Sequence, residues 1–284
     1  MKIARIEFGA KGRAAVRSPS GDRIRQAFSF AVPQGGCAPW PACRRQDRLA
    51  AGTAWFVVLK IGGSLGRGDG LADLCREVSR LAARHPLLVV PGGGAFADAV
   101  RDHYSRYSLS ETTAHRMALL AMDQYGCLLA DLTPGSVPVT DLLSARRAAQ
   151  AGQAPILLPA ALLIQADPLP HSWQVTSDSI AAWVAGLARA RRLILLKDVD
   201  GLFSADPARP GAKLLGELTV AELGGRASLP QEGHVLRYGG VDPYLPTTLA
   251  ALDLETWIIN GRHPARLAEL LETGRTVGTC ITRR

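Results

Sequence analysis

Apolar positions along the chain form short continuous runs that alternate with longer stretches of helical spacing. The runs at residues 56–61 and 87–90 are uninterrupted, and each ends in a glycine-rich turn. Such runs are typical of parallel strands that are buried on both faces of a sheet. Between them, apolar residues recur at spacings of three and four from Leu71 to Leu81, which predicts an amphipathic helix.

The same alternation continues along the rest of the chain. Ser110 is a good N-cap for a helix that extends to Leu128, and another helix is predicted from Asp178 to Ala190. Further strands are predicted at residues 137–139, 155–158, 193–196 and 256–259. Strands that alternate with helices predict an α/β protein whose mostly parallel central sheet is covered on both faces.

Composition is that of a globular protein with a large core. Of the 284 residues, 47% are hydrophobic, enough for one large α/β domain or two small ones. The five cysteines include no CxxC pair, which argues against a disulfide framework or a zinc site and fits a reducing cytoplasm. The longest apolar run, residues 154–164, contains two prolines and is too short to span a bilayer. We therefore expect a cytoplasmic protein with no secretory signal and no membrane partner.

Charge separates the first 53 residues from the rest of the chain. Residues 1–53 hold ten basic and three acidic side chains, so they carry nearly all of the formal net charge of +8. They lack sustained periodicity, which predicts a poorly ordered basic extension; a regulatory or partner-binding arm is the alternative. Residues 54–284 then form the folded domain, and their balanced charge predicts no nucleic-acid partner.

Two glycine-rich turns follow the first two predicted strands. The first, Lys60-Ile61-Gly62-Gly63-Ser64, offers backbone N–H groups and a lysine to phosphate oxygens; an ordinary turn with a solvent-facing lysine is the alternative. The second, Gly92-Gly93-Gly94, opens a helix and suits an anion. Residues 92–97 also fit the G-x-G-x-x-A dinucleotide fingerprint, although the acidic residue expected later, Glu111, starts a helix instead of ending a strand.

A third candidate site follows the strand predicted at residues 193–196. The loop that begins there is dense in acidic and glycine residues and suits a nucleotide or Mg²⁺, although an Asp-Gly pair alone is usually only a turn. Asp178 lies at the start of the helix that precedes this strand, in Thr176-Ser177-Asp178-Ser179. The segment is either a helix cap or the source of a carboxylate that orients catalytic lysines. The chain has no P-loop and no protein-kinase motifs, so phosphoryl transfer here requires another architecture.

The order of KIGGS, PGGG, TSDSIAA and KDVDGLFSADP resembles that of the amino acid kinase superfamily, which includes acetylglutamate, glutamate, uridylate and isopentenyl phosphate kinases. The resemblance covers residues 55–284. It implies a three-layer αβα sandwich, with an acceptor-binding half at residues 54–165 and an ATP-binding half at residues 166–284.

Three segments, residues 115–126, 172–183 and 259–261, look more narrowly like the aminomethylfuran-methyl-phosphate kinase branch. That branch converts a furan-methyl monophosphate to its diphosphate in methanofuran biosynthesis. The chain departs from two sister families: it lacks the His that isopentenyl phosphate kinases carry after the glycine triplet, and it has Asp198 where uridylate kinases have a Lys.

The resemblance also implies roles for individual residues. Lys60 is expected to contact the transferred phosphoryl group, with Asp178 orienting it and Lys213 as a candidate second lysine; the role of Lys197 stays open. The residues expected to bind phosphate or acceptor are Gly62, Gly63, Ser64, Gly92, Gly93, Gly94 and His115. Those expected to bind the nucleotide are Lys197, Asp198, Asp200, Gly201, Phe203 and Asp206.

The implied protein is a homo-oligomeric kinase that uses ATP and Mg²⁺ and phosphorylates a small molecule. Three alternatives stay open: another acceptor such as an amino acid, UMP or isopentenyl phosphate; a nucleotide-binding storage or regulatory protein without turnover; and a dinucleotide oxidoreductase.

Overall fold

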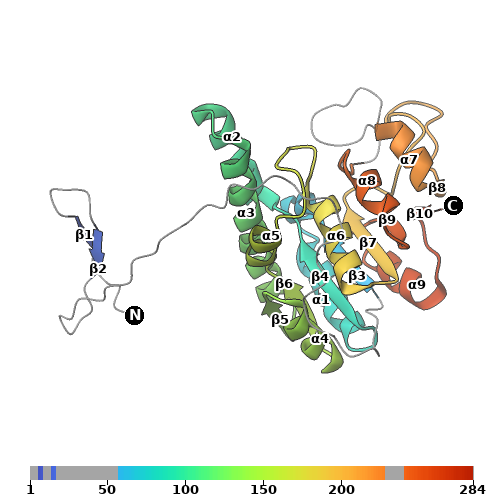
Figure 1. Cartoon of the computed structure of the whole chain (residues 1–284). Coiled ribbons are helices and arrows are strands. Elements are labelled where there is room, and N and C mark those ends of the chain that lie inside the picture. The colour runs from blue at the N-terminus through green and yellow to red at the C-terminus, as the bar shows by residue number, and fades with distance from the viewer. Residues whose placement is uncertain (1–5, 9–13, 17–56, 228–239, 284) are drawn as a thin grey trace. The chain divides into compact units, whose positions relative to one another are not determined.

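The computed structural model describes residues 57–227 and 240–283 together with two short strands near the N-terminus (Figure 1). These strands, β1 (Ile6–Phe8) and β2 (Ala14–Val16), pair antiparallel. They belong to a compact unit, Met1–Ala51, that is separate from the unit Gly52–Arg284. The rest of the predicted basic extension lies outside the described residues.

The second unit is built on an eight-stranded sheet in the order β5-β6-β4-β3-β7-β9-β10-β8. From β5 to β9 every neighbouring pair is parallel, whereas β10 pairs antiparallel with β9 and parallel with β8. The strands are β3 (Val57–Ile61), β4 (Leu87–Pro91), β5 (Ser136–Val139), β6 (Ala154–Leu157), β7 (Arg192–Lys197), β8 (Glu217–Thr219), β9 (Glu255–Asn260) and β10 (Thr279–Thr282).

Helices cover both faces of this sheet, as expected for a three-layer αβα sandwich (Figure 1). Ser110 caps α3 through a hydrogen bond that its side chain accepts from Thr113 N. The helices are η1 (Gly63–Arg67), α1 (Leu71–Ala82), α2 (Gly94–Tyr107), α3 (Glu111–Leu132), α4 (Leu142–Gln150), α5 (Ala160–Ala166), α6 (Ser177–Ala188), α7 (Val220–Ala227), α8 (Leu245–Ala250) and α9 (Ala265–Thr273).

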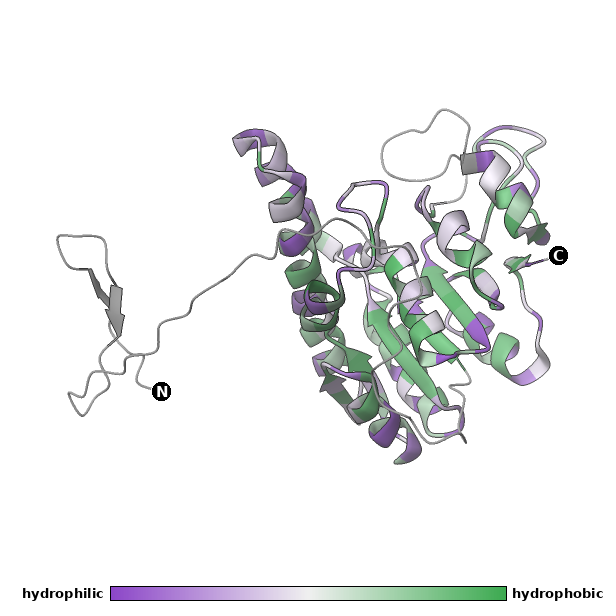
Figure 2. Ribbon diagram, in the orientation of Figure 1, coloured by the Kyte–Doolittle hydropathy of each residue, from purple (hydrophilic) through white to green (hydrophobic). Residues whose placement is uncertain are grey.

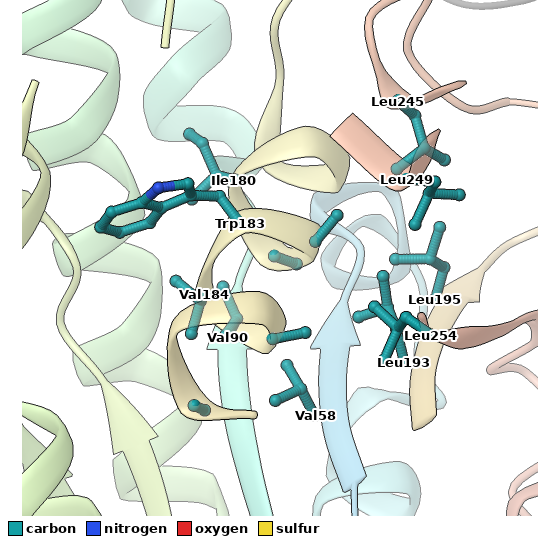
Figure 3. Close-up of a cluster of buried hydrophobic side chains, with 14 of the residues drawn as sticks. Val58, Val90, Ile180, Trp183, Val184, Leu193, Leu195, Leu245, Leu249 and Leu254 are labelled. Carbon is teal, nitrogen blue, oxygen red and sulfur yellow. The ribbon is translucent and has the colours of Figure 1, made fainter. Parts of the chain in front are cut away.

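The central strands are apolar along their length because each face packs against helices (Figure 2). Alternate residues of β3 point to opposite faces: Val58 joins the cluster under α6, and Leu59 joins the cluster under α1 and α9. Figure 3 shows the first cluster, which includes Val58 of β3, Leu195 of β7 and Val184 of α6. This alternation of side chains along a strand therefore decides which residues at the strand ends face α6.

The strands and helices predicted from the apolar pattern are all present, with bounds that differ by a few residues. The reversed strand β10 and its partner β8 were not predicted, because each has only three or four residues and no long apolar run. Within the described residues, no helix is both long and apolar enough to cross a membrane.

Candidate active site

The candidate site lies where the sheet changes its direction of winding. Strands from residues 57–157 occupy one side of the sheet, and strands from residues 192–282 occupy the other, with β3 and β7 adjacent at the boundary. In open α/β sheets, ligands bind outside the carboxyl ends of the strands at such a switch point. The first glycine turn follows β3, the acidic loop follows β7, and the second glycine turn follows β4, next to β3.

Asp178 is the buried centre of this edge and binds two lysines. Its Oδ1 lies 2.8 Å from Lys60 Nζ, and its Oδ2 lies 2.6 Å from Lys197 Nζ. The exposed fractions of the Lys60 and Asp178 side chains are only 3% and 1%. The expected contact between Asp178 and Lys60 is present, and the alternative of a solvent-facing Lys60 is wrong.

Strand register explains why both lysines reach the same carboxylate. β3 and β7 run parallel with Ile61 opposite Leu196, so Lys60 and Lys197 lie at the same end of adjacent strands. Lys60 follows Val58 by two residues, and Lys197 likewise follows Leu195; both apolar residues face α6. Asp178 sits in the first turn of α6, which is where a carboxylate is favoured by the helix dipole.

Burial and charge compete at these groups. Burial lowers the pKa of Lys60 to about 8, with attraction from Asp178 opposing the shift. Burial acts to raise the pKa of Asp178, but the attraction of Lys197 and Lys60 outweighs it and lowers that pKa to about 2. Asp178 is therefore ionised at neutral pH and pairs with both buried lysines. An ammonium group has three hydrogens, so each lysine retains a donor for an arriving phosphate.

The two glycine turns pack backbone against backbone. A Cβ on Gly63 would overlap the N and Cα of Gly94, and Gly94 itself has a φ of +56°. Glycine is required where main chains come this close. Gly62 N donates to Leu196 O at 2.9 Å, and Gly92 N donates to Ile61 O at 2.8 Å.

The amides of Gly62 and Gly92 therefore already donate to carbonyl groups at the ends of neighbouring strands. The expectation that Gly62 offers its N–H to phosphate needs correction. In the part of the chain that the structure describes, no backbone acceptor is found for the N–H groups of Gly63, Gly93 and Gly94. These three amides, at the starts of η1 and α2, stay the predicted anion donors.

The acidic loop after β7 is tied to the first glycine turn and to β9. Ser64 Oγ donates to Asp198 Oδ1 at 2.9 Å. This bond links a residue predicted to bind phosphate or acceptor to one predicted to bind the nucleotide. Asp200 Oδ1 accepts from Asn260 Nδ2 at 2.9 Å and from Arg266 Nη1 at 2.5 Å. Asp200 therefore holds the loop in place, and its Oδ1 is already occupied by these two donors.

Farther along, the same loop folds back on itself. Phe203 bridges to Leu214, and Ser204 N donates to Lys213 O at 2.9 Å. Gly201 packs against Thr279, whose Oγ1 accepts from Leu202 N at 2.8 Å. Asp206 Oδ1 accepts from Ala208 N, and the Lys213 side chain is exposed. The structure places Lys197, and not Lys213, on the carboxylate that also binds Lys60; a phosphate-binding role for Lys213 stays a prediction.

Sequence reasoning missed a second buried carboxylate beside Asp178. Asp242 is fully buried and accepts four hydrogen bonds, from the N and Oγ1 of Thr176 and from the N and Oγ of Ser179. Gly240 O accepts from Lys197 Nζ at 2.5 Å. Burial and the charge of Asp178 raise the pKa of Asp242. The only local signal was a glycine, Gly240, two residues before the aspartate, with no predicted strand to place it.

His115 lies in a different group of side chains. Its ring stacks on His171, with ring centroids 4.3 Å apart, and both rings neighbour Asp167. Its predicted contact with the acceptor stays a prediction.

Comparisons with known proteins identify the family of the chain. A sequence model described as the Amino acid kinase family matches residues 55–260. The chain is 30% identical over 227 residues to a (5-(aminomethyl)furan-3-yl)methyl phosphate kinase of Methanocaldococcus jannaschii, which spans 79% of this chain and 96% of that protein. It is 28% identical to a uridylate kinase of Methanospirillum hungatei, over 80% of this chain and 94% of that one.

A solved structure shows the same fold at lower identity. The uridylate kinase of Archaeoglobus fulgidus superposes with a TM-score of 0.63 at 21% identity, covering 80% of this chain and all of that one.

Proposed function

The chain belongs to the amino acid kinase family, and on that premise we propose that it transfers the γ-phosphoryl group of ATP to a small phosphomonoester. The acceptor that we favour is the furan-methyl phosphate named for the M. jannaschii relative, and phosphorylation of a phosphate gives a diphosphate. UMP, the acceptor implied by the name of the second relative, is the alternative of the same chemical class.

The observation that carries this proposal is the pair of buried lysines on Asp178. When one phosphate attacks another, two anions must approach each other, so neutralisation and positioning supply most of the catalysis. Lys60 and Lys197 provide two cations at the ends of adjacent strands. Gly63, Gly93 and Gly94, whose amides have no backbone acceptor among the described residues, lie at the starts of η1 and α2.

In this proposal the two sides of the sheet divide the substrates. The acceptor lies over the β3 and β4 turns, and ATP lies over the loop after β7, which holds Asp198, Phe203 and Asp206. Lys60 stands at the boundary, where its ammonium meets the oxygens of the transferred group as a point charge. Asp178 holds Lys60 and Lys197 in position, and Asp242 holds the start of α6, from which Asp178 projects.

The residues at this edge fit Mg²⁺ bound mainly through the nucleotide. No group of three or more His, Cys, Asp or Glu ligand atoms gathers there among residues 57–227 and 240–283. Mg²⁺ usually takes one or two carboxylates together with substrate phosphates and water. Asp198, exposed at the rim of the loop, would be its protein ligand, and the ion would neutralise charge on the phosphates.

A turnover screen tests the proposal. The full chain would be given MgATP with the furan-methyl phosphate, UMP or glutamate, and ADP release would be measured. We expect acceptor-dependent turnover with a phosphomonoester and none with glutamate. Turnover with glutamate alone would contradict the acceptor class. Tight ATP binding without turnover on any acceptor would favour a storage or regulatory protein, and NADH binding in place of ATP would favour an oxidoreductase.

A further inference from the structure

Away from the phosphate edge, three metal-ligating side chains from two parts of the chain meet. His115 is on α3, Asp167 is the C-terminal cap of α5, and His171 is in the segment between α5 and α6. Their ligand atoms all lie within 4.8 Å of one another, and both histidines are half-buried. No second group of this kind occurs in the described ranges.

Both ring nitrogens of His171 have oxygen neighbours. Its Nδ1 lies 3.0 Å from Thr112 Oγ1, and its Nε2 lies 2.8 Å from Asp167 Oδ1. In the tautomer whose Nδ1–H donates to Thr112, Nε2 has a lone pair on the side of the carboxylate. A metal ion bound by Nε2 and Asp167 would replace their mutual contact, and a ligating histidine normally donates its other N–H to an oxygen in this way.

His115 brings a second imidazole to the same place, with its ligand atom within 4.8 Å of those of His171 and Asp167. Its ring already lies against that of His171, with 21° between the two planes.

We propose that His115, His171 and Asp167 form a binding site for a divalent transition metal, with Zn²⁺ as the best match. Two imidazoles and one carboxylate are a normal zinc ligand set, with water in the fourth position. Binding a common ion requires the two stacked rings to turn so that one nitrogen of each faces it. The absence of paired cysteines therefore excluded only one kind of zinc site.

The role of the metal is to fasten the segment between α5 and α6 to helix α3. Trp173, in the same segment, packs edge-on against Tyr104 of α2, with centroids 5.4 Å apart, and beneath Arg101. The segment leads directly into Thr176 and Asp178. A metal at its far end would restrict the motion of the chain that enters the active site.

Titration of tag-free full-length protein tests this site, whether or not the chain is a kinase. After removal of metals with EDTA, Zn²⁺ would be titrated by calorimetry, and Co²⁺ would be titrated by its visible absorbance. We expect saturable binding of a single ion and a rise in melting temperature with Zn²⁺. His115→Phe keeps an aromatic ring against His171 without a ligand atom and should abolish binding.

Two further variants separate ligands from neighbours. Thr112→Val should weaken binding by roughly 10-fold, as expected for loss of an orienting partner. His103→Ala, on α2 and bonded to Ala99 O, should bind like the wild type. Asp167→Asn, checked for folding by circular dichroism, tests the carboxylate if His115→Phe does not fold. No saturable binding by the wild type, or equal binding by the wild type and the ligand variants, overturns the proposal.

Discussion

Asp178 and Asp167 each meet a pair of basic side chains, but their surroundings are opposite. Asp178 has an exposed fraction of 1% and binds two buried lysines, whereas Asp167 has an exposed fraction of 60% and meets two half-buried histidines. Around Asp178, burial and mutual attraction hold the charged groups in one arrangement. Around Asp167, water screens the interaction between the carboxylate and the histidines, so their arrangement is less constrained.

The difference predicts that loss of the carboxylate costs more stability at Asp178 than at Asp167, and that Asp167 can rearrange more readily around the metal that we propose. Removing a partner from a buried ion pair leaves an uncompensated charge, whereas removing one from an exposed pair leaves a solvated group.

The largest effect is expected from Asp178→Ala, because it leaves Lys60 and Lys197 buried together without their anion. We expect the free energy of unfolding to fall by about 3–5 kcal/mol. The matched variant Asp167→Ala should change it by less than about 1 kcal/mol in metal-free buffer. Urea denaturation of both proteins makes the comparison, and similar losses in the two would refute the contrast.

Next is Lys60→Met, which keeps the apolar stem and removes the charge. Asp178 retains Lys197, so the protein should stay folded, while kcat falls by roughly 100-fold or more, as for loss of one preorganised donor. Parallel measurement of kcat and of the ATP dissociation constant should show the larger change in kcat. Lys197→Met is the matched variant, and near-wild-type kcat in folded Lys60→Met removes Lys60 from the mechanism.

The pKa of Lys60 predicts how activity depends on pH. Because that pKa is about 8, the free enzyme loses the Lys60 charge above pH 8, and kcat/KM should fall by roughly tenfold per pH unit there. Lys60→Arg, which cannot lose its proton, should lack this decline.

Stability has the opposite sign over the same range. The unfolded chain holds the Lys60 proton up to its ordinary pKa of 10.5. Between pH 8 and that value the unfolded state therefore binds more protons, and this group's contribution to the free energy of unfolding rises with pH. A wild-type profile of kcat/KM against pH without a decline above pH 8 would contradict the role assigned to the Lys60 charge.

Asp242→Asn should give a smaller effect, because Asp242 acts on the site only through α6. Its four donors are N–H and O–H groups, and an amide nitrogen cannot accept any of them. We expect a loss of about 1–3 kcal/mol in stability and a fall in kcat of roughly tenfold. A purely structural residue would lower stability without changing kcat in the protein that remains folded.

The smallest effect is expected from Lys213→Ala, an exposed residue. Its stability should change by less than about 0.5 kcal/mol. A kcat decrease as large as that of Lys60→Met would show that Lys213, and not Lys197, is the second phosphate-neutralising lysine.

The apolar pattern was sufficient to predict the strands of the sheet from β3 to β7 and β9. The motifs at the strand ends indicated Lys60 and the glycine turns as candidates, and the motif at the start of α6 indicated Asp178. Lys197 was ambiguous from sequence because its role depends on which strand lies beside β3, a fact of register and not of motif. Asp242 and the pair of His115 and His171 were beyond local reasoning, since their partners are supplied by other elements of the fold.

The reversed strand β10 has a consequence for the order in which the protein folds during synthesis. β10 lies between β9 and β8, and Thr279 at its start accepts the hydrogen bond from Leu202 that anchors the loop after β7. It also follows every other element in the chain. The strands over which we propose that the acceptor binds can therefore leave the ribosome before this anchor exists, so we expect the proposed nucleotide loop to be fixed only late in synthesis.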